Sequence, residues 1–311
     1  MTEPPAVPPL LLRRTAVAQG WSDDELARAV RSGELTRLRR GAYVDAVLPA
    51  EPAARHALLV EATLAALRLP GVVSHQSAAV LLGLPLWDVP LDRVHITRPP
   101  GSRSDRSGVL CTHVARIRDH DVVDVGGMPV TDPVRTMLDL ARSLPHEAAV
   151  VALDAALHRG LLSHDALRAR LFDIVGSPGA RSAARAVAAA DARSESVGES
   201  RSRVILQRWK PAPSAVQFPI RSGGGQLLAR TDFAWEDVRL VGEFDGRVKY
   251  GRLLRPGQEA GDAVFAEKRR EDAVRDEGWD VVRWVWAELA VPHRLAAKVR
   301  RAHERAGRRR R

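Results

Sequence analysis

The chain has 311 residues, of which 45% are hydrophobic and 28% are charged. This length and composition exclude a disordered chain and a single small domain, and they predict two or three domains with substantial cores. The single cysteine, Cys111, excludes an intramolecular disulfide and a zinc site built from cysteine thiolates.

The chain is strongly basic, with a formal net charge of +10. Such a balance favours a polyanionic partner, with nucleic acid as the first candidate. Nearly all of the positive charge is arginine, so a coding bias toward arginine is the alternative, and charge alone does not decide between them. The N-terminus lacks a basic secretion-signal region and no stretch approaches the length of a membrane span, so we expect a cytoplasmic protein that does not bind a membrane.

Residues 1–50 predict a winged helix-turn-helix. A helix should begin at Ser22, because Glu25 three residues later completes a capping box, and should end at Gly33. Residues 35–44 then predict a short basic hairpin. We expect the hairpin to contact DNA phosphates and the preceding helix to approach the groove. The alternative is a small helical cap whose arginines are simply solvated. The predicted DNA-binding residues are Arg28, Arg31, Arg37, Arg39 and Arg40.

Residues 51–190 predict a mixed α/β domain. Helices are expected within 54–70 and 74–85, strands within 92–99, 108–115 and 121–131, and further helices within 132–144, 146–160, 163–175 and 177–194. His75, His95, His113 and His120 show no metal-ligand spacing, so we interpret each of them as structural or solvated. An exposed apolar patch here would indicate a third class of function, a module that binds another protein.

Residues 191–311 predict a second mixed α/β domain. A helix within 194–209 is followed by strands within 214–222, 227–235 and 238–246, a helix within 262–278, a strand within 279–286 and a closing helix within 291–306. The expected order is therefore αβββαβα, a meander followed by a crossover helix to a further strand. The basic tail from Arg308 to Arg311 is expected to add phosphate contacts.

Three carboxylates interrupt the apolar strands of this last domain. Glu243 and Asp245 share one face of a strand, and Asp232 lies near the end of the preceding strand. Clustered acids need protonation or a divalent cation, and Mg²⁺ or Mn²⁺ prefers such oxygen ligands. The spacing predicts a metal site at which Lys249 assists. The alternatives are that Asp245 marks a turn, that Asp232 ends its strand in solvent, and that Glu243 pairs with an arginine such as Arg283.

The order and spacing of these elements resemble the PD-(D/E)XK nucleases, in particular the domains related to very-short-patch repair (Vsr) endonucleases. The resemblance covers roughly the last 120 residues and implies a restriction-endonuclease-like αβββαβ core with a Mg²⁺-dependent phosphodiesterase site. Two positions depart from the pattern. Asp245 stands where the family has lysine, and Lys249 stands where it often has histidine, so either Lys249 or Lys268 supplies the ammonium or the site only binds DNA. The matching residues are Glu199, Asp232, Glu243, Asp245, Gly246, Lys249, Arg270, Gly278, Trp279 and Arg283.

The stretches "DELARAVRSGELTRLRRGAYV" and "VVSHQSAAVLLGLP" resemble the AbiEi-type antitoxins of abortive-infection toxin–antitoxin systems. That resemblance implies binding to promoter DNA, repression of the chain's own operon and a possible toxin partner.

The sequence therefore predicts a DNA-binding protein with a metal-dependent nuclease-like domain, and the alternative is a non-catalytic regulator or antitoxin. In the predicted mechanism Asp232 and Glu243 ligate Mg²⁺, aided by the backbone carbonyl after Glu243 or by Asp245, and the metal activates water. Lys249 or Lys268 stabilises the pentacovalent phosphate, and Glu199 orients the site or a second metal. Glu195, one helical turn before Glu199, is the alternative to it.

Overall fold

A computed structural model describes residues 10–44, 48–67, 69–103, 108–246 and 260–310. The chain divides into two compact units, one of Met1–Ala152 with Leu162–Val187 and one of Leu153–Leu161 with Ala188–Arg311. The predicted boundary near residue 190 lies close to this division, whereas the further boundary at residue 50 stays a prediction. No helix in the described part of the chain is long and apolar enough to cross a bilayer.

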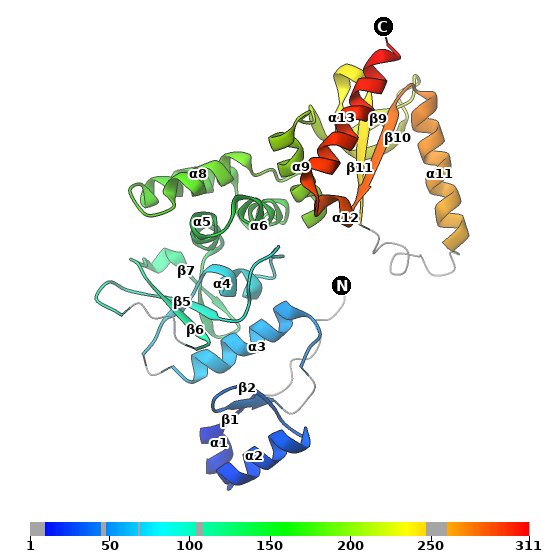
Figure 1. Ribbon diagram of the computed structural model, residues 1–311. Helices are drawn as coiled ribbons and strands as arrows, with labels where there is room; N and C mark the ends of the chain where they lie inside the picture. Colours follow the sequence, from blue (N-terminus) through cyan, green and yellow to red (C-terminus); the bar gives the residue numbers. More distant parts are fainter. Residues whose placement is uncertain (1–9, 45–47, 68, 104–107, 247–259, 311) are drawn as a thin grey trace. The chain divides into compact units, whose positions relative to one another are not determined.

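The first unit begins with a small helix-turn-helix and a hairpin (Figure 1). β1 (Leu10–Leu12), α1 (Arg13–Ala18), α2 (Asp23–Ser32), β2 (Thr36–Arg39) and β3 (Ala42–Val44) follow one another, and the antiparallel strands lie in the order β1-β3-β2. The predicted ends of α2 are confirmed. Ser22 and Glu25 form the reciprocal capping box, and Gly33 ends the helix with a left-handed φ of 81°.

The predicted mixed α/β character of residues 51–190 is confirmed. The sheet has the order β6-β5-β4-β8-β7, in which β5 with β6 and β4 with β8 are parallel. The two-residue strand β4 was not predicted, because a run this short has no readable period. The elements are α3 (Pro52–Ala65), β4 (Val72–Val73), α4 (His75–Leu81), β5 (Val94–Arg98), β6 (Leu110–Val114), β7 (Val122–Val125), β8 (Met128–Thr131), α5 (Pro133–Ser143), α6 (His146–His158), α7 (His164–Leu171) and α8 (Ala180–Ala189).

The end of α6 belongs to the second unit and carries a buried ion pair. Asp154 is fully buried, and its carboxylate accepts a hydrogen bond of 2.6 Å from Nη2 of Arg203 on α9 (Val197–Trp209). The backbone N–H of Asp191 donates to the same carboxylate at 2.8 Å. Burial raises the pKa of Asp154, and Arg203 opposes that shift. The pair therefore fixes α9 against the end of α6.

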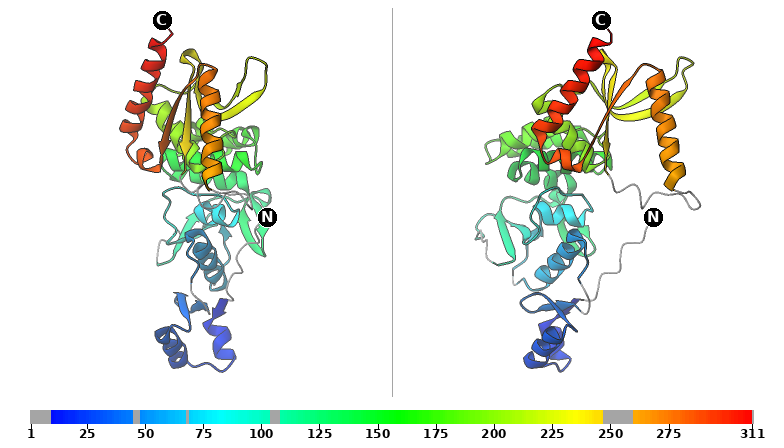
Figure 2. Two further views of the ribbon diagram at one scale, coloured as in Figure 1. Left: turned by 90° about the vertical axis from the view of Figure 1, so that its right-hand side faces the viewer. Right: turned by 45° about the vertical axis from the view of Figure 1, so that its right-hand side comes forward.

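The second unit is a four-stranded mixed sheet covered on both faces. Its strands lie in the order β12-β11-β10-β9, antiparallel except for β11 with β12. α11 covers one face, and α9 and α13 cover the other (Figure 2). The predicted element order is confirmed, with one addition: the end of the last predicted strand starts the short helix α12. The remaining elements are β9 (Ala215–Arg221), β10 (Leu227–Trp235), β11 (Leu240–Asp245), α11 (Ala260–Asp276), β12 (Asp280–Val285), α12 (Trp286–Leu289) and α13 (Pro292–Arg308).

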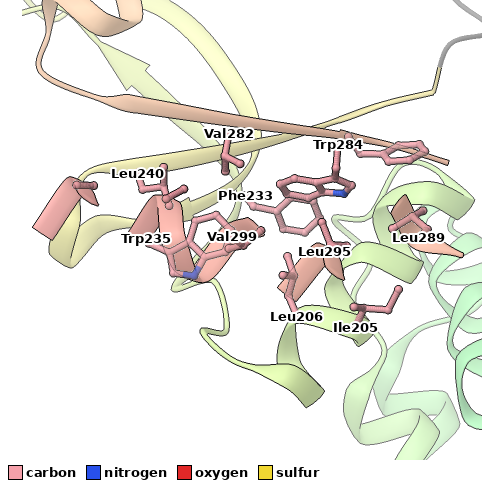
Figure 3. Packing of buried hydrophobic residues seen from close by; sticks show 13 residues of the cluster. Ile205, Leu206, Phe233, Trp235, Leu240, Val282, Trp284, Leu289, Leu295 and Val299 are labelled. Carbon is pink, nitrogen blue, oxygen red and sulfur yellow. The ribbon is translucent and has the colours of Figure 1, made fainter. Parts of the chain in front are cut away.

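The core between the sheet and α9 and α13 is aromatic (Figure 3). Phe233, Trp235 and Trp284 are each almost completely buried there. The indole of Trp284 donates to Ser202 Oγ at 2.7 Å, which satisfies its one buried polar atom. Gly242 on β11 makes this packing possible, because a Cβ at that position would lie 2.6 Å from Trp284 Cη2 and 3.1 Å from Trp235 Cζ3.

We predict that Gly242→Ala lowers the free energy of unfolding of this unit by about 1–3 kcal/mol, because two stiff buried indoles would have to move. Gly223→Ala is the matched control, since a Cβ there meets nothing within 4 Å. Urea denaturation followed by tryptophan fluorescence measures both. Equal stability of the two variants would contradict the packing described for Gly242.

Candidate functional site

The basic residues of α2 and the β2–β3 hairpin form the candidate nucleic-acid interface. Arg28, Arg31, Arg37 and Arg40 are exposed, as a phosphate-binding surface requires. Arg39 differs from them, because it is only partly exposed and desolvation lowers the pKa of its guanidinium. Within the described residues, Arg39 Nε is buried without a hydrogen-bond partner. Four of the five predicted arginines are therefore presented to solvent.

The first turn of α2 is acidic, which limits how the helix can meet DNA. Asp23, Asp24 and Glu25 all lie in it. Arg13 donates two hydrogen bonds of 2.6 Å to Asp23, and this contact lowers the pKa of the Asp23 carboxyl. Acids repel phosphates, so the first turn is disfavoured as the contact point and the arginines further along α2 are favoured.

Asp232 has a clear structural task in the second unit. The β10–β11 ladder pairs Phe233 with Gly242 and continues to Trp235 and Leu240. Just beyond the Phe233–Gly242 end of that ladder, the backbone N–H of Phe244 donates to Asp232 Oδ2 at 2.8 Å. The carboxylate therefore replaces a backbone carbonyl at the point where the backbone pairing of the two strands ends.

Glu243 forms the ion pair that the sequence left open as an alternative. The parallel register of β11 and β12 places it opposite Arg283, and Arg283 Nη2 lies 3.0 Å from Glu243 Oε2. The same Nη2 lies 2.9 Å from Oε2 of Glu271 on α11. Glu243 is thus neutralised by an arginine that also joins the sheet to α11. Asp245 ends β11 and is partly buried.

Glu199 lies at the start of α9, where it acts in helix capping. The Ser196 hydroxyl donates to Glu199 Oε1 at 2.7 Å, and the Glu199 backbone N–H donates to Ser196 Oγ at 3.2 Å. Glu199 Oε2 also accepts a hydrogen bond of 2.8 Å from Nε2 of Gln217. Glu195 is engaged elsewhere, with Arg230 at 2.7 Å.

Gln217 is a residue that the sequence analysis did not single out. It has a positive φ of 52° on β9, and the register places it between the partners of Thr231 and Phe233, beside Asp232. It therefore connects Glu199 to the strand position of Asp232. A lone glutamine in an otherwise ordinary strand gives no signal that would have identified it.

The two predicted lysines are not placed at the acids by the described structure. Lys268 is exposed on α11. Lys249 lies outside the described residues. The metal and the catalytic assignments of Asp232, Glu243, Asp245, Lys249, Lys268 and Glu199 all stay predictions.

Three histidines of the first unit converge, although their spacing in the sequence is not that of metal ligands. One ligand nitrogen from each of His75, His95 and His113 lies within 4.8 Å of the other two nitrogens. Among the described residues, these three histidines form a group of potential metal ligands. His75 begins α4, while β5 and β6 pair in parallel and carry His95 and His113. His95 Nδ1 lies 2.9 Å from His113 Nε2. The three lie 18 or more residues apart in sequence, so only strand pairing brings them together.

The backbone and the burial of His75 both distinguish it from the other two histidines. Its φ is 53°, a left-handed conformation that costs a residue other than glycine about 1–3 kcal/mol. Its side chain is almost fully buried, and that burial holds the pKa of His75 well below its ordinary value. His120, by contrast, has a side chain that is 59% exposed, in agreement with its interpretation as solvated.

A polar cavity of about 470 Å³ lies in the same unit. Its lining includes Arg118, Arg135 and Arg170. Arg118 binds Asp173 at 2.8 Å, Arg135 binds Asp139 at 2.8 Å, and Arg170 binds both Asp121 and Asp173. The lining also includes Arg116 and Arg142, so the cavity wall carries an ion-pair network with more arginines than acids.

Comparison with known proteins finds a family model that matches the N-terminal elements. Residues 8–44 match the family model "Transcriptional regulator, AbiEi antitoxin". Over 185 residues the chain is 32% identical to two Mycobacterium tuberculosis proteins, the uncharacterized proteins MT2308 (strain CDC 1551 / Oshkosh) and Rv2248 (strain H37Rv). The match covers 58% of this chain and 64% of each relative.

A solved structure, the RV2827C protein of M. tuberculosis, is also similar. The sequence identity is 18% and the TM-score is 0.40, and the match covers 58% of this chain and 72% of that one. Of these comparisons only the family model bears on function, and its match at residues 8–44 agrees with the second resemblance of the sequence.

We predict that Asp232→Ala lowers the free energy of unfolding of the second unit by about 1–3 kcal/mol, since it leaves the Phe244 N–H without its acceptor. Asp232→Asn should cost less, because its amide oxygen still accepts that hydrogen bond. Urea denaturation checks both variants. If Asn and Ala prove equally destabilising, the capping task assigned to Asp232 is refuted.

Proposed function

We propose that the chain is a DNA-binding transcriptional regulator of the AbiEi antitoxin type. The observation that carries the proposal is that the family match and the fold of residues 8–44 point to the same kind of protein. This segment matches the regulator family model, and it folds as a helix-turn-helix followed by a basic hairpin. The net charge of +10 also favours a polyanionic partner, which agrees with DNA binding.

In the proposed complex the hairpin and α2 have separate tasks. Arg37 and Arg40 on the hairpin neutralise phosphates and set the position of the protein on the duplex. Arg28 and Arg31 lie beyond the acidic first turn of α2 and approach base edges or the flanking backbone. Repression of the chain's own operon, and a toxin as its protein partner, follow from the family as further parts of this proposal.

We expect the double variant Arg37→Ala/Arg40→Ala to weaken DNA binding and to make the slope of log affinity against log salt shallower by roughly two, one unit for each lost phosphate contact. Fluorescence anisotropy with the DNA upstream of the chain's own gene, and with a random duplex of equal length, measures both quantities. Arg168→Ala/Arg185→Ala is the charge-matched control, since both arginines are exposed on other helices of the first unit.

Retention of wild-type affinity and salt slope by the hairpin variant would exclude this interface. Absence of any preference for the upstream DNA over the random duplex would exclude a sequence-specific regulator and leave general nucleic-acid binding.

A second candidate is the Mg²⁺- or Mn²⁺-dependent phosphodiesterase activity of the second unit. It is favoured by one observation, the αβββαβ order with β11 parallel to β12 and acids on neighbouring strands. Asp232 and Glu243, aided by Asp245, would hold the ion, and carboxylate oxygens suit it. When bound, the ion would supply Lewis-acid activation of water and charge neutralisation. Glu243 would have to exchange Arg283 for the ion, so the fit requires a rearrangement.

For this candidate we expect plasmid or single-stranded DNA to be cleaved with Mg²⁺ or Mn²⁺ and to stay intact with EDTA. Asp232→Asn/Glu243→Gln should abolish the cleavage, since it removes two anionic ligands while keeping their size and hydrogen-bond acceptors. Gel electrophoresis of the products is the measurement. Cleavage that survives in this variant would remove these acids from the reaction.

A further inference from the structure

We propose that His75, His95 and His113 form a binding site for one divalent transition-metal ion of the Zn²⁺ class. The site lies in the β4–β6 region of the first unit. It is independent of the proposed DNA interface and of the acids of the second unit, and it adds a cofactor to the middle of the chain.

The distances are close to those that a zinc ion requires. Zn–N bonds of about 2.0–2.1 Å at tetrahedral angles place ligand nitrogens about 3.3 Å apart. The three ligand nitrogens already lie within 4.8 Å of one another, and His95 Nδ1 lies 2.9 Å from His113 Nε2. Binding would replace that hydrogen bond by two metal bonds and would need only a small opening between these two rings.

His75 needs the larger adjustment. Its ring stacks on that of His113, with centroids 3.7 Å apart and planes 14° from parallel. A metal ion must lie near the plane of each imidazole that binds it, so the His75 ring has to tilt out of this stack. A ligand nitrogen of His75 already lies within 4.8 Å of those of His95 and His113, so the tilt is a movement of the side chain.

Neighbouring polar groups indicate which nitrogens face the ion. Ser74 Oγ lies 3.0 Å from His75 Nδ1, and Gln76 Nε2 lies 2.7 Å from His95 Nε2. These contacts leave His75 Nε2 and His95 Nδ1 directed at the cluster, together with His113 Nε2. A half-turn of the Gln76 amide would let its oxygen accept the His95 Nε2–H, the outer-shell contact that orients a metal-binding histidine.

The donor set selects the class of ion. Three imidazoles suit Zn²⁺ and related transition metals, whereas Mg²⁺ and Ca²⁺ require oxygen ligands. Cys111, also on β6, places Sγ 3.6 Å from His113 Nε2, but it does not belong to the group of ligand atoms that all lie within 4.8 Å of one another. The three imidazoles therefore make an open site, whose fourth position would hold water.

The test uses the full-length chain without a polyhistidine tag, stripped with a chelator and titrated with Co²⁺ as a spectroscopic substitute for Zn²⁺. We expect binding of one equivalent with the visible absorption bands of a tetrahedral nitrogen-ligated ion. His95→Ala and His113→Ala should each weaken binding by more than the roughly 10- to 100-fold that loss of an outer-shell partner costs. Gln76→Ala should fall within that smaller range.

His120→Ala is the matched control, since that histidine is exposed, and it should bind like the wild type. Asp232→Asn/Glu243→Gln should also retain the Co²⁺ spectrum, because its acids lie in the other unit. Zn²⁺ should raise the melting temperature of the wild type but not that of His113→Ala. Circular dichroism establishes that each variant is folded.

Two outcomes would overturn the proposal. One is a folded wild-type chain that binds no Co²⁺ and gains no thermal stability from Zn²⁺, which would make the cluster a hydrogen-bonded histidine network only. The other is binding by His95→Ala and His113→Ala with the same affinity and spectrum as the wild type. If both substitutions prevent folding, the Gln76→Ala affinity decides, and an unchanged value refutes the site.

Discussion

The parallel pairing of β11 with β12 is the constraint on which the second unit depends. A parallel pair needs a crossover, which α11 supplies, and the crossover covers one face of the sheet. The register of this pair sets Glu243 opposite Arg283, and Arg283 then reaches Glu271 on α11. The register of this one strand pair therefore gives Glu243 a cation of the protein as its partner. A bound metal ion would have to replace that cation.

The other face of the same sheet packs against an aromatic core. Gly242 lies between Trp235 and Trp284, and the absence of a side chain lets both indoles pack against the strand. Next to it, Phe244 is held from two directions, by the core around its ring and by Asp232 at its N–H. This packing positions the strands that carry Asp232 and Glu243. It is compatible both with a purely structural role of these carboxylates and with a role in holding an ion.

In the first unit, parallel strand pairing brings histidines together. β5 and β6 bring His95 and His113 to neighbouring positions, and the turn from β4 into α4 adds His75. The proposed DNA interface lies in other elements, α2 and the β2–β3 hairpin. A regulator with these features would read DNA with its first elements while a metal ion, where bound, stabilises the sheet that follows.

The sequence by itself determined the elements that depend on local chemistry. The capping box at Ser22, the glycine that ends α2, the basic hairpin and the αβββαβ order all follow from short-range patterns, and the structure confirms each of them. It also offered the correct partner for Glu243, but only as one of several alternatives, because spacing within a strand does not reveal which strand lies beside it.

Only the tertiary structure decided the contacts that cross between elements. The histidine cluster has no signal in sequence spacing, since His75, His95 and His113 meet through strand register and not through separation along the chain. The same is true of Gln217 beside Glu199 and of Asp232 at the Phe244 N–H. A side chain's partner in a sheet is set by long-range pairing, which a single sequence read locally does not specify.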